Sequence, residues 1–289
     1  MRAYLPAYEL VTPSDLHEAL GMLEREPGAW KVFAGGTDLM VSLAAGHLPA
    51  GKFINLWNFA ELKTIREDPD HITLGALTTY TQVQENRTLQ SEFPMLCQAA
   101  FETGGIAIQN RGTLGGNIAN ASPAADSCPP LLAYDAELEL VSARGARRVP
   151  YRNFHTGYKA TLMHPDELIA QIRLPRLNSP AWRHYFRKVG TRRAQAISKV
   201  CLSARARVQS GRIEEICIAL GSIAPTVIRC PSTESTLTGS TIDRGMIDQA
   251  RQVLAREISP INDMRSTARY RTRVAGNLLQ EFLEGLIPE

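Results

Sequence analysis

Apolar residues recur at helix and strand spacings along most of the chain, and they predict where its elements lie. Near the N-terminus, an alternating pattern around Tyr8 predicts a strand, and Ser14 is expected to cap a helix in which Leu16, Ala19, Leu20 and Leu23 recur at helical spacing. An apolar run over 30–34 predicts a buried strand and one over 53–56 another strand, separated by a helical pattern that Thr37 is expected to cap. This order predicts a β-turn-α unit at the start of the chain.

The same patterns continue to residue 174. The elements predicted there are a hairpin across REDPDH (66–71), helices that begin at Thr79, Phe93 and Ser122-Pro123, a hairpin across Arg144 and Gly145, and a strand over 168–174. Prolines and small polar residues over 175–180 predict a linker. We therefore expect a first α+β domain over residues 1–176.

Antiparallel strands followed by helices are predicted beyond the linker. The strands cover 184–189, 200–208 and 213–220, with a tight turn at Ser210 and Gly211, and the helices cover 243–258 and 266–286. Residues 181–287 are thus expected to form a second, smaller α+β domain.

Two glycine pairs carry the candidate chemistry. We name residues 34–39 (AGGTDL) the first glycine turn and residues 113–118 (TLGGNI) the second glycine turn. Glycine allows positive φ and close approach of backbone N–H groups to a ligand, and a following helix start attracts anions. The N–H groups of 35–38 and of 115–117 are therefore expected to bind a ligand with two phosphates. The Rossmann pattern G-x-G-x-x-G is absent from the sequence, so another dinucleotide fold is required.

Composition narrows the classes of function. A net charge of +3 with dispersed arginines favours neither nucleic acid nor a membrane surface as a partner. Five cysteines without a C-x-x-C pair lack the usual signature of an iron–sulfur cluster or a structural zinc site, and are typical of buried thiols in a reducing compartment. The first ten residues lack the apolar core of a signal peptide, so we expect a cytoplasmic protein.

VFAGGTDL at 32–39 followed by TLGGNIANASPAAD at 113–126 resembles the FAD-binding (medium) subunit of molybdenum hydroxylases of the xanthine dehydrogenase type. FHTGY at 154–158, DELIAQIRLP at 166–175 and RSTARYRTRVAGNLL at 265–279 are similar to the same family, so the likeness spans the chain. It implies a bipartite FAD-binding domain of two α+β subdomains, followed by a C-terminal domain of the carbon monoxide dehydrogenase flavoprotein type. Within the family, the AGGTDL run at 34–39 resembles the xanthine dehydrogenase branch.

The resemblance also implies roles for individual residues. Asp126 is expected to reach the ribose, Ile169 to lie by the adenine or the flavin edge, and Lys188 by the isoalloxazine. Asp38 has two readings, as a partner of ribose hydroxyls or as an ordinary helix-start carboxylate. The cofactor-lining residues implied are Val32, Phe33, Ala34, Gly35, Gly36, Thr37, Asp38, Leu39, Thr113, Gly115, Gly116, Asn117, Ile118, Asp126, Ile169 and Lys188.

By the same resemblance, this subunit takes electrons from iron–sulfur clusters on a small partner, which receives them from a molybdopterin partner, and passes them to NAD+ or another acceptor. The alternative is a stand-alone FAD-dependent oxidase or reductase. A third reading is an assembly subunit without FAD, because IAIQN at 106–110 departs from the family's PQIRN-like run.

Overall fold

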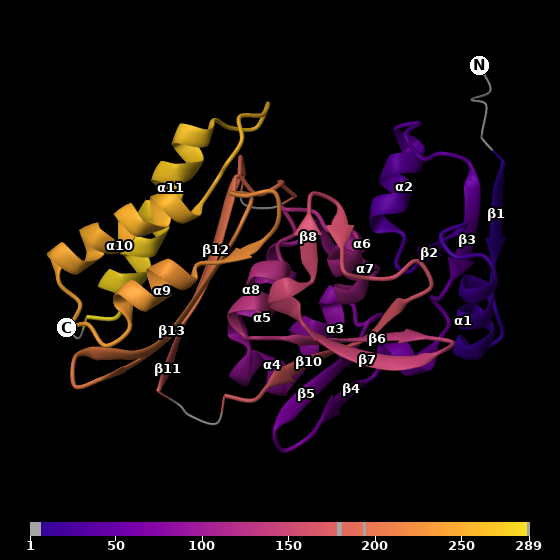
Figure 1. Ribbon diagram of the computed structural model, residues 1–289, viewed down its shortest axis with the longest axis horizontal. Helices are drawn as coiled ribbons and strands as arrows, with labels where there is room; N and C mark the ends of the chain where they lie inside the picture. The colour runs from indigo at the N-terminus through magenta and orange to yellow at the C-terminus, as the bar shows by residue number, and fades with distance from the viewer. Residues whose placement is uncertain (1–6, 178–180, 193–194, 288–289) are drawn as a thin grey trace.

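The computed structural model describes residues 7–177, 181–192 and 195–287. Within them the chain forms two neighbouring α+β subdomains and a third α+β unit beside them (Figure 1). Of the expected linker, residues 178–180 lie outside the described ranges. In the part described, no helix combines the length and the apolar character needed to cross a bilayer.

The first subdomain is a parallel three-stranded sheet in the order β1-β3-β2. Its core includes Leu20, Leu23, Trp30 and Ile54. Asp15 caps α1, not Ser14 as expected, because its Oδ1 accepts the Glu18 N–H at 2.8 Å while the Ser14 hydroxyl donates to the Glu18 carboxylate. The elements are β1 (Tyr8–Val11), α1 (Leu16–Arg25), β2 (Trp30–Phe33), α2 (Thr37–Ala44) and β3 (Gly51–Asn55).

The second subdomain is built on an antiparallel sheet in the order β4-β5-β10-β6-β7. Both predicted hairpins are present in it. The elements are η1 (Ala60–Lys63), β4 (Ile65–Glu67), β5 (His71–Gly75), β6 (Glu137–Ser142), β7 (Gly145–Pro150), η2 (Tyr151–Asn153) and β10 (Leu168–Pro175), with β8 (His155–Gly157) and β9 (Ala160–Thr161) paired separately.

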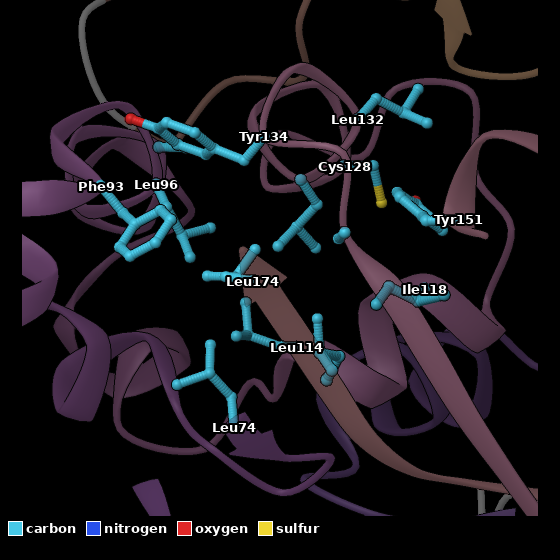
Figure 2. Close-up of a cluster of buried hydrophobic side chains, with 14 of the residues drawn as sticks. Leu74, Phe93, Leu96, Leu114, Ile118, Cys128, Leu132, Tyr134, Tyr151 and Leu174 are labelled. Atoms are coloured by element: carbon cyan, nitrogen blue, oxygen red, sulfur yellow. The ribbon is translucent and has the colours of Figure 1, made fainter. Parts of the chain in front are cut away.

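Of the six helices in this subdomain, five bury aromatic and aliphatic side chains against the sheet (Figure 2), and the short helix Ile106–Gln109 contributes none to this core. Thr79 caps the first of them through a capping box with Gln82, as expected. The helix predicted at Ser122 begins instead at Cys128, since the Pro123 carbonyl accepts the N–H of Ser222 and residues 122–126 remain a turn. The helices are α3 (Tyr80–Glu85), α4 (Arg87–Glu92), α5 (Pro94–Glu102), α6 (Ile106–Gln109), α7 (Leu114–Ala119) and α8 (Cys128–Ala133).

The C-terminal unit is an antiparallel sheet in the order β11-β12-β13-β14, with three helices on one face (Figure 1). Its core, which includes Leu202, Ile218, Leu254 and Phe282, is distinct from the other two. The predicted strands and both long helices are present, whereas α9 and β14 were not anticipated. The elements are β11 (Trp182–Val189), β12 (Val200–Gln209), β13 (Arg212–Gly221), β14 (Ile228–Arg229), α9 (Pro231–Leu237), α10 (Arg244–Glu257) and α11 (Ala268–Glu284).

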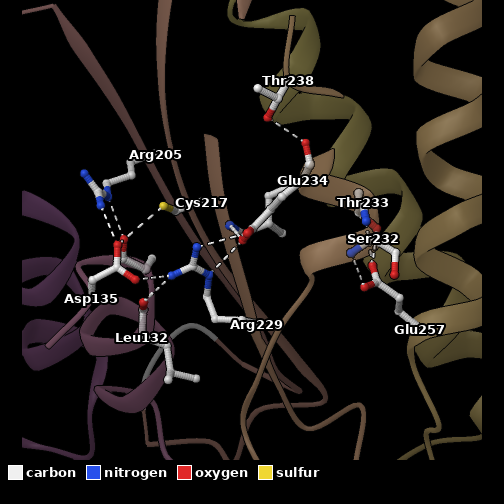
Figure 3. A network of polar contacts seen from close by, with 12 residues as sticks. Leu132, Asp135, Arg205, Cys217, Arg229, Ser232, Thr233, Glu234, Thr238 and Glu257 are labelled. Atoms are coloured by element: carbon white, nitrogen blue, oxygen red, sulfur yellow. Dashed lines mark hydrogen bonds and ion pairs between the residues drawn. The ribbon is translucent and has the colours of Figure 1, made fainter. Parts of the chain in front are cut away.

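Polar contacts fasten the C-terminal sheet to α8. Arg205 donates to the Ala133 carbonyl at 2.6 Å and to Asp135 at 2.8 Å. Arg229 donates to the Leu132 carbonyl at 3.0 Å and to the other oxygen of Asp135, and it also pairs with Glu234 (Figure 3). The end of α8 is thus held by two arginines, one from β12 and one from β14, which lie on either side of β13.

Candidate functional site

Both glycine turns open onto one cavity of about 620 Å³ between the two N-terminal subdomains. This volume lies within the usual range for small-molecule and cofactor sites, roughly 300–1,000 Å³. Of the residues expected at the cofactor, the cavity is lined by Val32, Ala34, Gly35, Gly36, Thr37, Asp38, Leu39, Thr113, Gly115, Gly116, Asn117 and Ile169. Sequence reasoning missed further lining residues, among them Leu56, Leu77, Tyr80, Asn120, Leu168 and Ile197.

The first glycine turn joins β2 to α2 and leaves its backbone donors unused. Gly36 caps the helix with φ +76°, which glycine adopts without strain, so Thr37 is the first helical residue and not the cap that was expected. Within the described residues, the N–H groups of 35–39 have no hydrogen-bond acceptor. Five unpaired donors at a helix N-terminus that lines a cavity are suited to an anionic ligand.

The second glycine turn differs, because its N–H groups are already paired. Gly115 N–H donates to the Ala76 carbonyl at 2.8 Å and Asn117 N–H to the Thr113 carbonyl at 2.9 Å, while Gly116 N–H donates to the Thr113 hydroxyl at 3.1 Å. Leu114 N–H donates to the Thr78 carbonyl at 3.0 Å. The expectation that both turns offer free backbone donors therefore holds only for the first.

The two turns lie against each other. A Cβ added at Gly35 would lie 1.7 Å from the Arg111 carbonyl oxygen, and one added at Gly116 would lie 3.8 Å from Ala34 Cβ. Across the rim, Asn120 Nδ2 donates to Asp38 at 3.1 Å. Gly35 is thus required by close approach of two backbone segments, and the second turn forms the wall opposite the unpaired donors.

Four of the expected residues do not line the cavity. Ile118 is fully buried in the core, and the Phe33 ring packs beneath Gly36, where an added Cβ would approach it to 2.6 Å. Asp126 and Lys188 instead form a buried ion pair with 2.6 Å between Oδ2 and Nζ. The structure thus brings Asp126 and Lys188 together outside the cavity lining, and their contacts with the ribose and the isoalloxazine stay predictions.

The Asp126–Lys188 pair also joins the C-terminal unit to the N-terminal half. Lys188 of β11 donates to the Glu102 carbonyl at 2.9 Å, and the Ser198 hydroxyl donates to the second oxygen of Asp126. Burial raises the pKa of Asp126, and the charge of Lys188 opposes that rise. The two charges compensate each other out of water, beside Thr103 and Ile197, which do line the cavity.

No histidine or cysteine contributes a metal site among the residues that the structure describes. Burial lowers the pKa of His155, whose Nε2 is 2.9 Å from the Ile118 carbonyl oxygen. Cys97 is partly buried and the other four cysteines are buried, and burial raises the pKa of Cys128 to about 12. These groups are structural.

Comparisons with known proteins agree with this arrangement. Residues 6–177 match the family described as the FAD binding domain in molybdopterin dehydrogenase, and residues 184–286 match the CO dehydrogenase flavoprotein C-terminal domain. The putative xanthine dehydrogenase FAD-binding subunit XdhB of Escherichia coli is 34% identical over 95% of this chain and 92% of its own. The carbon monoxide dehydrogenase medium chain of Hydrogenophaga pseudoflava is 27% identical over 96% of each chain.

Comparison with solved structures points to the same family. A structure of carbon monoxide dehydrogenase from Hydrogenophaga pseudoflava, which lacks the Mo-pyranopterin moiety of its cofactor, superposes with a TM-score of 0.93 at 26% identity, covering 97% of both chains. The predicted α+β fold, with its FAD-binding domain and its C-terminal domain of the carbon monoxide dehydrogenase flavoprotein type, is confirmed. The chain therefore belongs to the FAD-binding subunits of the molybdenum hydroxylases, the oxidoreductases of the xanthine and carbon monoxide dehydrogenase type.

Proposed function

We propose that the cavity seats FAD with its diphosphate on the first glycine turn. The observation that carries this is the set of five unpaired N–H groups over residues 35–39, at the start of α2 and on the cavity wall. A diphosphate is costly to remove from water unless its oxygens meet donors. Each hydrogen bond to a charged group contributes roughly 1.5–3 kcal/mol, so this turn supplies a large part of the affinity.

The remaining walls suit the rest of the cofactor. Leu56, Leu77 and Leu168 give an apolar surface that excludes water from a flat ring system. Asp38, which accepts a hydrogen bond from Asn120, lines the same cavity and in this proposal would accept from a ribose hydroxyl. Bound FAD supplies the redox chemistry, since it takes up two electrons and releases them again, while these residues bind and orient it.

We further propose that the chain acts within a larger assembly. Electrons would come from a substrate oxidised at a molybdenum centre on one partner, through iron–sulfur clusters on a second partner, and leave to NAD+ or another acceptor. Two observations support this role. The relatives are named as an FAD-binding subunit and a medium chain, and the five cysteines of this sequence are not spaced as cluster ligands.

The experiment is to purify the chain alone and to measure its visible spectrum, its metal content and its turnover. We expect flavin absorbance, neither iron nor molybdenum, and only NADH-dependent reduction of artificial dyes. Gly116→Asp should abolish the colour because it places a carboxylate in the wall of the anion site. Gly51→Asp, in β3 with no atom within 4 Å of an added Cβ, is the charge-matched control and should remain yellow.

Two outcomes would contradict the proposal. If the wild-type chain, incubated with excess FAD, retained none after gel filtration, the cavity would not be a flavin site. Turnover of a small organic substrate without any partner would instead indicate a stand-alone oxidase or reductase.

A further inference from the structure

Asn117, in the second glycine turn, has a side-chain amide nitrogen that makes no hydrogen bond within the described residues. Its backbone N–H is paired with Thr113, and the residue lines the cavity. The amide oxygen accepts the Ser127 hydroxyl at 2.7 Å and lies 3.7 Å from the Cys128 sulfur. Nδ2 has no acceptor anywhere in the described ranges of the chain, so its two hydrogens are available to a ligand.

Ser127 does not cap the helix that it precedes. It occupies the N-cap position of α8, but the residues whose N–H groups an N-cap hydroxyl would accept are Pro129 and Pro130, which have none. Here the hydroxyl makes no such bond and donates to Asn117 instead, and the residue is fully buried. The Ser127 hydroxyl and the Cys128 thiol both approach the amide oxygen, and this arrangement leaves Nδ2 as the part of the amide without a partner within the described residues.

The free amide hydrogens belong to the same cavity as the first glycine turn. Asn117 follows Gly116, whose added Cβ would touch Ala34, and Asn117 and Gly36 both line the cavity. The backbone donors of Gly115, Gly116 and Asn117 are all engaged. The side-chain amide is therefore what the second turn can offer to an anion held by the first.

We propose that Ser127 is a positioning residue for the phosphate site, since its buried hydroxyl holds the Asn117 amide with Nδ2 toward the diphosphate. The inference rests on the proposed function, because it takes the anion to be the diphosphate of FAD. Ser127 itself does not touch the cofactor, and its effect passes through Asn117.

The test compares three ligands on the FAD-depleted full chain. FAD and ADP both carry a diphosphate, whereas riboflavin carries no phosphate. Ser127→Ala should weaken binding of FAD and ADP about fivefold, the size expected for one misaligned hydrogen bond, and leave riboflavin unchanged. Asn117→Asp keeps the acceptor for Ser127 and the size of the side chain, yet it places a carboxylate toward the phosphates, so FAD and ADP binding should fall at least about tenfold.

A double-mutant cycle separates positioning from general damage to the fold. Adding Ser127→Ala to Asn117→Ala should cause no further loss of FAD affinity, because the amide it positions is gone. Equal losses in both backgrounds, or an equal weakening of riboflavin, would overturn the role of Ser127 while leaving the FAD site in place. Failure of the wild-type chain to bind either FAD or ADP would overturn the proposed function itself.

Discussion

Gly35 is the residue at which the first glycine turn touches the segment that immediately precedes the second glycine turn. Its Cα faces the Arg111 carbonyl so closely that the backbone of residue 111 occupies the place of a side chain. Arg111 also donates through Nε to the Gly35 carbonyl at 3.4 Å, and its guanidinium lies 3.7 Å above the Trp57 ring. The absence of a side chain at Gly35 thus allows the first glycine turn to lie directly against the backbone of Arg111.

Gly35→Ala should separate these two segments. The added Cβ meets backbone atoms, which cannot move aside as a flexible side chain could, so we expect a loss of stability of at least about 1–3 kcal/mol and a weakening of FAD binding by about tenfold or more. Gly51→Ala adds the same methyl group where nothing lies within 4 Å and should leave both unchanged. Thermal unfolding and FAD titration measure the two effects, and wild-type affinity in Gly35→Ala would contradict the assigned contact.

At the scale of elements, a buried ion pair between Lys188 and Asp126 joins β11 to the loops around the cavity. Lys188 and Asp126 are 4% and 9% exposed at their side chains, and each also binds a second group, the Glu102 carbonyl and the Ser198 hydroxyl. Replacing such a buried pair with apolar residues can be nearly neutral, but removing one partner is costly because the other charge stays buried. The pair therefore fixes how the C-terminal sheet meets the loop that precedes α8.

Lys188→Met should destabilise the FAD-free chain by about 3–5 kcal/mol, because Asp126 is left without its counter-charge. Adding Asp126→Asn should recover much of that loss, since a neutral amide is less costly to bury. Denaturant unfolding of the two variants without FAD checks both statements. If Lys188→Met unfolded like the wild type and lost only flavin affinity, Lys188 would instead belong to the cofactor, as the family resemblance implies.

At the scale of the whole molecule, the interface between the halves contains a neutral histidine. Tyr134 at the end of α8 is fully buried, and its hydroxyl oxygen lies 3.3 Å from Nδ1 of His184 on β11. Burial, together with the charge of Arg205, lowers the pKa of His184 from 6.5 to about 4. The unfolded chain therefore binds this proton at a higher pH than the folded chain does.

The sign of the pH dependence follows from that difference. The stabilisation from neutral His184 is complete above about pH 6.5 and is lost as the pH falls toward 4, where the folded state also takes up the proton. His184→Gln, which does not titrate, should show a smaller decrease in unfolding temperature between pH 7 and pH 5 than the wild type. Parallel decreases in the two proteins would contradict the assignment.

Much of the fold could be predicted from the sequence, because strand and helix periodicity is strong and Thr79 signals its helix start locally. The glycine pairs likewise marked the cavity. Which pair offers free donors could be predicted only in part. Thr113 takes the Gly116 and Asn117 N–H groups locally, whereas the Leu114 and Gly115 N–H groups go to Thr78 and Ala76, 36 and 39 residues earlier. The pairing of Asp126 with Lys188 also depends on tertiary contact across 62 residues, and no local pattern reports it.

The unpaired donors at residues 35–39 are main-chain amides, and this has a consequence for how the chain keeps its prosthetic group. Amides of the main chain neither ionise in the physiological range nor disappear when a side chain is exchanged. Retention of FAD should thus vary little with acidity over the interval in which the His184 contact weakens. Under mild acid, loosening would begin at the junction with the C-terminal sheet, and the flavin would be released only afterwards.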